Sequence, residues 1–206
     1  MIEKGIAVIG STTIDEIIHR NFSRFKIGGV TTYSGITYSR HGIKTCVLTN
    51  VANRDREIIK RLKQESIVVC PAVSEHLPAA IRVSHIVKAN RQEYESLIDF
   101  FRTDLTELMR QFKINEFVVT SGHKGGFVQT ITGEEIPYPA ASVKSNGDPT
   151  GAGDIFLAAY VIDRFYHRRS IRDACQYAAK LAARQIGGNY IQPDDLSLED
   201  WKKHRF

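Results

Sequence analysis

The stretch Asn146–Phe156, with the sequence NGDPTGAGDIF, is the strongest constraint on how this chain of 206 residues can fold. A turn signal at 147–149 precedes apolar residues that recur at helical spacing over Ile155–Phe165, so a loop should enter a helix near Gly151. The first backbone N–H groups of a helix have no intrahelical acceptor, and glycines let a ligand approach them closely. The stretch therefore predicts an anion-binding loop that suits a phosphate group.

Asp154 lies just inside the start of this helix, where a carboxylate would repel a bound phosphate. Its position is explained if Asp154 is a general base that takes the proton from an attacking hydroxyl group. The alternative is an ordinary acidic residue in the first turn of a helix, which the helix dipole favours. Two other nucleotide motifs do not fit, because a P-loop needs a Lys after its glycines and Phe156 replaces the third Gly of GxGxxG.

The nine-residue string DPTGAGDIF at 148–156 resembles the C-terminal signature of the ribokinase-like (PfkB) sugar and nucleoside kinases. The resemblance implies that Gly151, Ala152 and Gly153 form an anion hole and that Asp154 is the catalytic base. It also implies an α/β fold, a three-layer α/β/α doubly wound sheet with mostly parallel strands. ATP and Mg²⁺ are the cofactors that the resemblance implies.

Composition is that of an ordinary globular protein, with 42% hydrophobic and 25% charged residues, and we expect a single domain over 1–206. The net charge of +5 suits an anionic ligand, but basic and acidic residues are mixed along the chain, so no nucleic-acid partner is expected. Three separated cysteines favour a reduced, cytoplasmic setting, and no apolar run is long enough to span a membrane. The polar stretch 192–206 is expected to be a weakly docked tail.

Helices and strands alternate along the chain, which favours a doubly wound sheet. Short alternating segments over Glu16–Ile27 predict a hairpin, which by resemblance is a remnant of the lid over the substrate. The expected strands are 6–9, 44–50, 67–70, 81–87, 116–120, 126–130 and 134–137, and the expected helices include 31–41, 54–64 and 171–186.

Asp15 follows the first strand at the edge where open α/β sheets bind ligands. The resemblance implies that Asp15 holds acceptor hydroxyls and that Gly28 and Gly29 let bare backbone approach the substrate; a solvated turn residue and a simple glycine turn are the alternatives. The familiar sugar kinases carry Asn four residues after the second Gly, whereas this sequence has Tyr33. The acceptor pocket should therefore differ from theirs, and the pattern slightly favours the inositol-kinase branch.

Only a short connection at 71–78 separates the third expected strand from the next strand-like segment. In the family the remaining lid strands and the central βαβ units lie here, and each unit takes about 30 residues or more. The resemblance thus implies a compact form with a reduced lid and without the central βαβ units, either natural or produced by deletion. Such a loss exposes a sheet edge, so a homodimer formed through that edge or through the lid is expected.

Asn90 should cap a helix, with Glu93 in the third helical position, so a capping box explains both residues. The family has an Asn-x-x-Glu motif here that organises Mg²⁺, generally through water, and both roles can hold together. The helical pattern then runs to Phe112, with a possible break at 103–104.

The resemblance extends to a nucleotide site in the C-terminal half. The segment after the strand at 116–120 fits the family's Thr/Ser-x-Gly-x-x-Gly pattern, so Thr120, Gly122 and Gly125 would border the nucleotide. Thr150 of the signature and Ala179 of the last helix are further nucleotide-binding candidates. Ordinary turns and helix packing would need the same small residues.

The function that these patterns favour is an ATP- and Mg²⁺-dependent kinase, with Asp154 as general base, acting on a hydroxyl of a small polyol such as a sugar, an inositol or a nucleoside. The alternative is a non-catalytic nucleotide- or ligand-binding remnant of the kinase fold that acts through a partner or self-association. A purely structural α/β domain is the third possibility.

Overall fold

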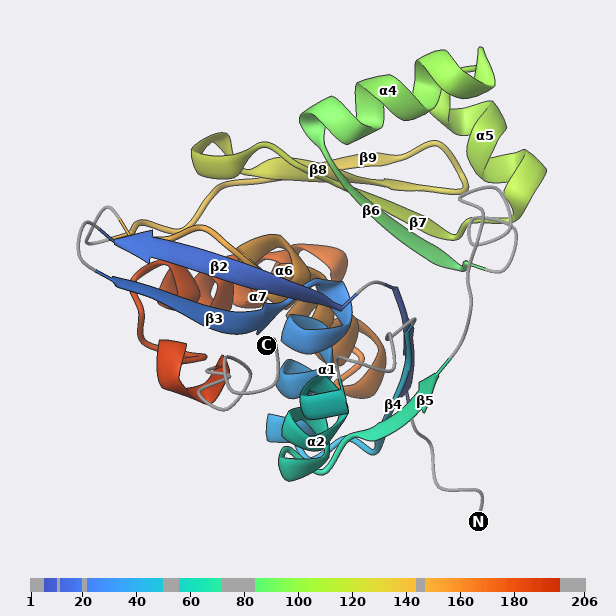
Figure 1. Ribbon diagram of the computed structural model, residues 1–206. Coiled ribbons are helices and arrows are strands. Elements are labelled where there is room, and N and C mark those ends of the chain that lie inside the picture. Colours follow the sequence, from blue (N-terminus) through green and yellow to red (C-terminus); the bar gives the residue numbers. More distant parts are fainter. Residues whose placement is uncertain are drawn as a thin grey trace.

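The computed structural model describes residues 6–10, 12–19, 22–49, 56–71, 84–143 and 147–196, and Figure 1 shows their arrangement. The first sheet is parallel, with strand order β1-β4-β5. Its strands are β1 (Ile6–Ile9), β4 (Thr45–Thr49) and β5 (Val68–Pro71). Parallel pairing of short apolar strands was the expectation for this third of the chain, and it is confirmed.

A second sheet has the order β6-β7-β8-β9, with one parallel pair followed by two antiparallel pairs. Its strands are β6 (Ile86–Asn90), β7 (Glu116–Thr120), β8 (Gly126–Thr130) and β9 (Glu135–Tyr138). The expected strand at 81–87 is corrected, because β6 begins at Ile86 and runs to Asn90, each residue paired with one of β7; residues 81–83 lie outside the described part. Lys88 is therefore a strand residue.

The two sheets are not joined by backbone pairing among the described strands, since β1 pairs only with β4 and β6 only with β7. Among the described strands, the expected doubly wound sheet is therefore present in two parts. Pro71 and Ile86 are too close in sequence for a βαβ unit of about 30 residues to bridge the sheets. The separation of the sheets agrees with the expected loss of the central units.

The third strand group is an antiparallel hairpin of β2 (Thr13–His19) and β3 (Phe22–Gly28), longer at both ends than the expected lid piece. Ile27 is fully buried at its base, whereas Ile18 near the tip is 77% exposed. The base of the hairpin is therefore packed against the body of the protein, and its tip extends beyond that body (Figure 1).

Helices fill the space around the sheets. They are α1 (Val30–Arg40), α2 (Arg56–Gln64), α4 (Arg91–Phe101), α5 (Leu105–Phe112), α6 (Ala152–Val161), a π-helical turn (Ile162–Tyr166) and α7 (Ile171–Ile186). Helices α4 and α5 cover one face of the β6–β9 sheet, and α6 and α7 lie on its other side (Figure 1). Asp104 caps α5, which confirms the expected break after α4.

Helix α1 is buried along most of its length, over 31–38. Two of its hydroxyl side chains bond the backbone four residues earlier: Thr32 Oγ1 donates to the Gly28 carbonyl at 2.7 Å, and Thr37 Oγ1 donates to the Tyr33 carbonyl at 2.7 Å. Because these hydroxyl groups are hydrogen-bonded, the helix can be surrounded by other elements. The larger hydrophobic core accordingly runs from the first sheet through α1 and α6 to the β6–β9 sheet, and includes Val47, Ile155 and Val118.

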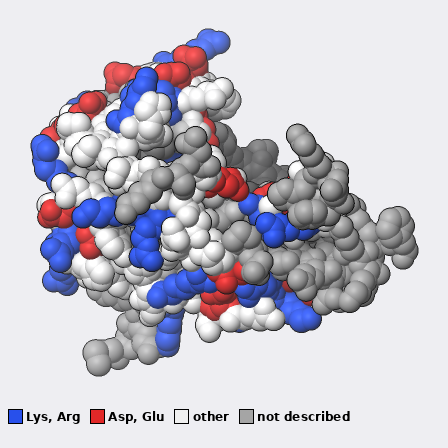
Figure 2. All heavy atoms as spheres, turned by 90° about the vertical axis from the view of Figure 1, so that its left-hand side faces the viewer, with Lys and Arg blue, Asp and Glu red and all other residues white. Residues whose placement is uncertain are grey.

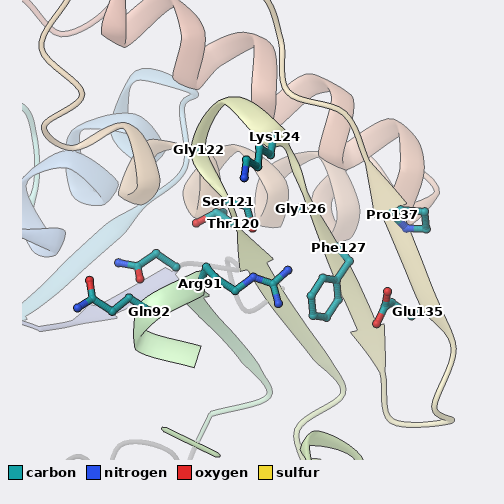
Figure 3. A pocket seen from close by; sticks show the side chains of 11 residues that line it. Arg91, Gln92, Thr120, Ser121, Gly122, Lys124, Gly126, Phe127, Glu135 and Pro137 are labelled. Carbon is teal, nitrogen blue, oxygen red and sulfur yellow. The ribbon is translucent and has the colours of Figure 1, made fainter. Parts of the chain in front are cut away.

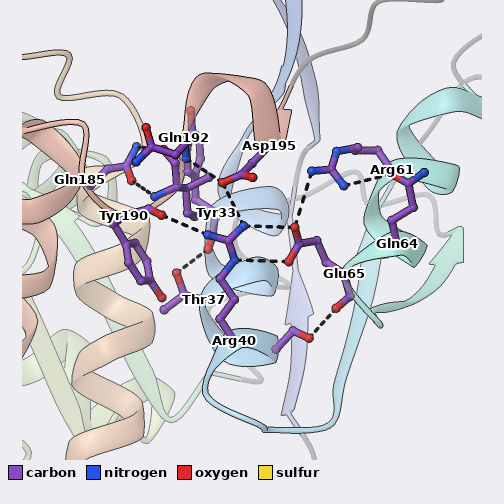
Figure 4. A network of polar contacts seen from close by, with 12 residues as sticks. Tyr33, Thr37, Arg40, Arg61, Gln64, Glu65, Gln185, Tyr190, Gln192 and Asp195 are labelled. Atoms are coloured by element: carbon purple, nitrogen blue, oxygen red, sulfur yellow. Dashed lines mark hydrogen bonds and ion pairs between the residues drawn. The ribbon is translucent and has the colours of Figure 1, made fainter.

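The end of the described chain is fixed by a network of charged groups at the C-terminal end of α1 (Figure 4). Arg40 lies 3.2 Å from Glu65 and 3.0 Å from Asp195, and its Nη1 donates to the Tyr190 carbonyl at 3.1 Å. Leu196 is 2% exposed. The expectation of a weakly docked tail is therefore wrong for residues 192–196, because a buried leucine and an ion pair hold them; residues 197–206 lie outside the described part.

Basic and acidic side chains are interspersed on the face shown in Figure 2. No helix in the described part of the chain combines the length and the apolar character that crossing a membrane requires.

We expect Arg40→Gln to lower the free energy of unfolding by about 1–2 kcal/mol, because it removes two partly buried ion pairs and a carbonyl contact at once. Urea denaturation measures the change. Lys60→Gln is the matched control, since its ion pair with Glu57 is at 3.6 Å and its side chain is 65% exposed, so its effect should stay below about 0.5 kcal/mol. Equal effects of the two substitutions would contradict a role of Arg40 in fixing the tail.

Candidate active site

The loop that enters α6 has the geometry that the sequence predicted. Gly151 is the N-cap, with a left-handed conformation (φ 76°), and Ala152 N–H donates to the Pro149 carbonyl at 3.0 Å. The N–H groups of Gly153 and Asp154 have no protein acceptor among the described residues. Unpaired donors at the positive end of a helix form a site for an anion.

Gly151 is held by a side chain of α1. A Cβ atom placed on Gly151 would lie 2.4 Å from the ring of Tyr33, so the ring packs directly on the glycine backbone. Ser34, the next residue, donates its hydroxyl to the Asp154 carbonyl at 3.2 Å. Helix α1 thereby fixes the position of the anion-binding loop, and both the positive φ and the close ring require glycine at position 151.

The carboxyl group of Asp154 is half-buried at the mouth of this loop. Burial raises its pKa above the ordinary aspartate value, the Lys88 ammonium lowers it again, and the Glu93 carboxylate adds a further increase. A raised pKa makes a carboxylate a better proton acceptor, which is the property that a general base needs.

Lys88 is the site residue that sequence reasoning missed. Its Nζ lies so close to the backbone of Gly153 that a Cβ atom placed on this glycine would be 2.7 Å from the Nζ. The expected strand ended at Val87, and Lys88 was assigned to the segment that follows it and opens the next helix, so this ammonium was not expected beside Gly153. Alternation along β6 would have been the signal, since Ala89 is buried against α4 and its neighbour Lys88 must point the other way.

Asn90 and Glu93 form the expected capping box at the start of α4. Asn90 Oδ1 accepts from Glu93 N–H at 2.9 Å, and Glu93 Oε2 accepts from Asn90 N–H at 2.7 Å. The structural role of the pair is therefore confirmed, while the expected role in holding Mg²⁺ stays a prediction. Within the described residues no three His, Cys, Asp or Glu side chains form a metal-binding cluster.

A cavity of about 650 Å³ lies between the start of α4 and the loop after β7 (Figure 3). Thr120, Ser121 and Gly122 line one side of it, and Asn90 and Arg91 line the other. Its volume is within the range of about 300–1,000 Å³ typical of small-molecule sites. The strand ends thus form a hollow of a size that fits a nucleotide or a polyphosphate.

Two cationic side chains reach this cavity. The guanidinium carbon of Arg91 lies 5.5 Å from the ring centroid of Phe127 and 5.7 Å from that of Tyr94, so two aromatic faces orient it. Lys124 lines the same cavity from the loop (Figure 3). Neither was a sequence candidate, although the position of Arg91 directly after Asn90 was an available signal.

The expected nucleotide residues do not all line this cavity. Thr120 and Gly122 do, whereas Gly125 is buried against the Tyr138 carbonyl and shapes the loop. Thr150 is exposed, and Ala179 is buried in α7 at 8% exposure. The structure therefore brings only part of the expected set together.

On the other side of the α6 loop, the base of the lid carries Asp15 and Lys26, which are directly opposite each other in the β2–β3 pairing. The Asp15 carboxylate lies over Gly28, where a Cβ atom would be 2.3 Å from its Oδ2. Lys26 is 8% exposed, and its Nζ lies 3.4 Å from Asp148 Oδ2. The ion pair ties the lid to the turn that precedes Gly151.

Tyr33 lies where the lid and the α6 loop meet, and it is 1% exposed. Burial raises the pKa of its hydroxyl, and the charges of Asp15, Asp148 and Asp154 raise it further. The phenol is therefore flanked by all three carboxylates and stays protonated, and among the described residues its hydroxyl has no hydrogen-bond partner. A hydroxyl placed in this way can serve as a donor to a bound ligand. Gly29 adjoins the site as the N-cap of α1.

The arrangement can bind an anion and move a proton in one place. Unpaired N–H groups meet the anion, the Asp154 carboxylate stands beside them, and polar groups of the lid base face the same loop. These are the parts that transfer of a phosphoryl group to a hydroxyl requires.

The charge of Lys88 gives a direct test of this geometry. Because the ammonium lowers the pKa of Asp154, Lys88→Met should raise that pKa, and Lys88→Arg should leave it near the wild-type value. A ¹³C NMR titration of the Asp154 carboxyl carbon measures the shift. Lys63→Met, which removes an exposed charge on α2, is the control and should have no effect. An unchanged titration in Lys88→Met would mean that the two groups are not neighbours in solution.

Comparison with known proteins identifies the family to which this chain belongs. A family model described as pfkB family carbohydrate kinase matches residues 36–194, which is more than half of the chain. A search of curated proteins found no match to the sequence.

Solved structures with this fold include a Burkholderia thailandensis nucleoside kinase in complex with inosine (TM-score 0.74, 14% identity, covering 91% of this chain and 93% of that chain). Ribokinase from Thermotoga maritima matches with a TM-score of 0.67 and 14% identity over 97% of this chain and 98% of that chain. A pyrophosphate-dependent kinase of the ribokinase family, complexed with a pyrophosphate analogue and myo-inositol, matches with a TM-score of 0.66 and 16% identity over 87% and 94%. The likeness shows that the fold is ribokinase-like.

Proposed function

We propose that this chain, which belongs to the pfkB family of carbohydrate kinases, transfers the terminal phosphoryl group of ATP to a hydroxyl group of a small polyol. The observation that carries the proposal is the pair of unpaired N–H groups at Gly153 and Asp154, with the Asp154 carboxylate beside them. Phosphoryl transfer needs little more from a protein than charge stabilisation, positioning and a proton acceptor.

In this proposal Gly151, Ala152 and Gly153 form the anion hole for the transferred phosphoryl group, and Asp154 takes the proton from the acceptor hydroxyl. The Tyr33 ring supports the proposal, because its packing on Gly151 holds the loop in a conformation that leaves the N–H groups of Gly153 and Asp154 unpaired.

The donor is proposed to lie along the loop after β7. Thr120 and Gly122 would contact it within the cavity, Gly125 would shape the loop, and Thr150 and Ala179 would contact the nucleotide from α6 and α7. The cationic groups in the cavity support a polyphosphate ligand.

Magnesium is proposed to bind near Asn90 and Glu93. The donor set fits, because Mg²⁺ takes oxygen ligands, keeps several waters, and needs only one or two carboxylates beside the substrate phosphates. Glu93 provides a carboxylate that is close enough to Asp154 to affect its pKa. When bound, the ion would neutralise charge on the phosphates. The Asn90 and Glu93 side chains would hold its water shell, while their capping box orients both groups.

The acceptor is proposed to lie between the lid and the α6 loop. Asp15 would accept hydrogen bonds from its hydroxyls, Tyr33 would donate one, and the backbone at Gly28 and Gly29 would let it come close. The named neighbours bind inosine or myo-inositol, so a nucleoside, an inositol or a sugar is the class to examine. Because Tyr33 stands where the familiar sugar kinases carry Asn, we propose inositols as the first acceptors to test.

A second candidate is a nucleotide- or ligand-binding protein without turnover, acting through a partner or self-association. The separated sheets favour it, because β6 has a strand neighbour on one side only among the described strands and Phe100 on the adjoining α4 is 66% exposed. A second copy covering this edge, or the lid, is the homodimer that we propose for either function.

The deciding experiment measures ADP formation from ATP and Mg²⁺ with a panel of sugars, inositols and nucleosides, beside ATP binding by calorimetry. Turnover that depends on one acceptor would support the kinase and identify its substrate. ATP binding without turnover on any acceptor would favour the non-catalytic candidate, and absence of binding would contradict both.

For the kinase, Asp154→Asn should lower kcat by about 10²–10⁴-fold and leave the affinity for ATP largely unchanged, because it removes the base and keeps the backbone donors. Steady-state kinetics and calorimetry on the same preparation separate the two effects. Asp99→Asn, an exposed aspartate on α4, is the matched control and should keep full activity. Wild-type turnover in Asp154→Asn would remove Asp154 from the mechanism.

A further inference from the structure

Lys88 lies on the side of β6 that faces the start of α6. Its neighbours on the strand, Val87 and Ala89, pack against the α4 and α5 layer, so alternation turns Lys88 away from that layer. The ammonium comes to rest over Gly153, where a Cβ atom would be 2.7 Å from Nζ. The lysine thus reaches the turn that presents the unpaired N–H groups, and glycine at position 153 makes room for it.

The Lys88 ammonium has no ion-pair partner among the described residues, although two carboxylates are near. The charges of Lys88 and Glu93 both act on the pKa of Asp154, and among the described residues neither Asp154 nor Glu93 forms an ion pair with Lys88. The side chain is half-buried. A half-buried charge without a partner is unfavourable, so this ammonium is ready for an anion that the protein itself does not supply.

We propose that Lys88 is a catalytic residue that binds the non-bridging oxygens of the transferred phosphoryl group. The inference rests on the proposed kinase function. As the acceptor oxygen forms its bond to the γ-phosphorus, its proton passes to Asp154. The bond from that phosphorus to the bridging oxygen breaks, and ADP leaves with the electron pair. Lys88 stays protonated throughout and stabilises the negative charge on the phosphoryl oxygens between the two partners.

Lys88 has a different task from the backbone donors. Amide N–H groups carry partial charges that are fixed in direction, whereas an ammonium group carries a full charge on a flexible stem that can follow the phosphoryl group as it moves. Its effect should therefore be larger in the transition state than in the complex with bound ATP. The kinetic consequence is a loss in kcat that exceeds any change in KM.

The test compares Lys88→Met, which keeps an unbranched side chain one atom shorter and without its charge, with Lys88→Arg and with the control Lys63→Met. Kinetics are measured with the acceptor found for the wild type. The pH is chosen on the plateau of the pH–rate profile, above the range in which Asp154 titrates, because losing Lys88 also moves the pKa of Asp154. We expect Lys88→Met to lower kcat by about 10²–10³-fold with KM values within about threefold. Lys88→Arg should recover most of the loss, and Lys63→Met should match the wild type.

A second readout does not depend on turnover. Binding of ADP with aluminium fluoride and the acceptor, a mimic of the transferring phosphoryl group, should weaken by about 10²-fold or more in Lys88→Met, while binding of ATP alone changes little. Urea denaturation checks that the variant remains folded. The ratio of the two affinities, for the mimic and for ATP, is compared between variant and wild type, because unfolded protein lowers both affinities equally and leaves their ratio unchanged.

Two results would overturn the inference while leaving the kinase in place. Full recovery of kcat in Lys88→Met at high pH would show that the lysine acts only on the pKa of Asp154, and unchanged binding of the fluoride mimic would show that it does not touch the phosphoryl group. Absence of turnover by the wild type with every acceptor would instead contradict the proposed function, and this inference with it.

Discussion

The packing of α1 against the start of α6 is the constraint on which the site depends. A helix end with unpaired N–H groups costs free energy unless a ligand or water satisfies them, so something must keep the loop from closing on itself. The Tyr33 ring does this by lying against Gly151, and the Ser34 hydroxyl fixes the Asp154 carbonyl at 3.2 Å. Because Tyr33 is 1% exposed, its ring has little freedom to move. The loop that packs on this ring is therefore held as firmly as the core itself.

The same packing explains how the chain manages without a continuous sheet. Residues of the first sheet and of the β6–β9 sheet belong to one hydrophobic cluster that passes through α1, α6 and α7. Helices therefore supply the connection that central strands would otherwise give. The first sheet leads into the lid that carries Asp15, and β6 and β7 end at Asn90 and Thr120, so in the proposed kinase both sheets would still contribute residues to the site.

Local features of this fold were predictable from sequence, and contacts between distant segments were not. The loop into α6 at Gly151 and the capping box of Asn90 follow from short-range patterns of turn residues and caps, and the structure has both. The separation of the sheets, the burial of residues 192–196 and the place of Lys88 depend on pairing and packing across many residues. Lys88 was missed because the strand was expected to end at Val87, whereas pairing with β7 extends β6 to Asn90, and only then does the alternation of Val87, Lys88 and Ala89 indicate where the lysine points.

The position of Asp154 would place a carboxylate beside a bound phosphate, and the charges around Asp154 bear on the repulsion between these two groups. A base must stand next to the phosphate whose acceptor it activates, yet two negative groups repel, and burial strengthens the repulsion. Burial and, to a lesser degree, the Glu93 carboxylate raise the pKa of Asp154. Lys88 opposes both effects from the opposite side, beside Gly153. In the proposed kinase, one ammonium group would thus lower the pKa of the base and offer a positive charge where the phosphate must come, so that a carboxylate and an anion hole could share the first turn of one helix.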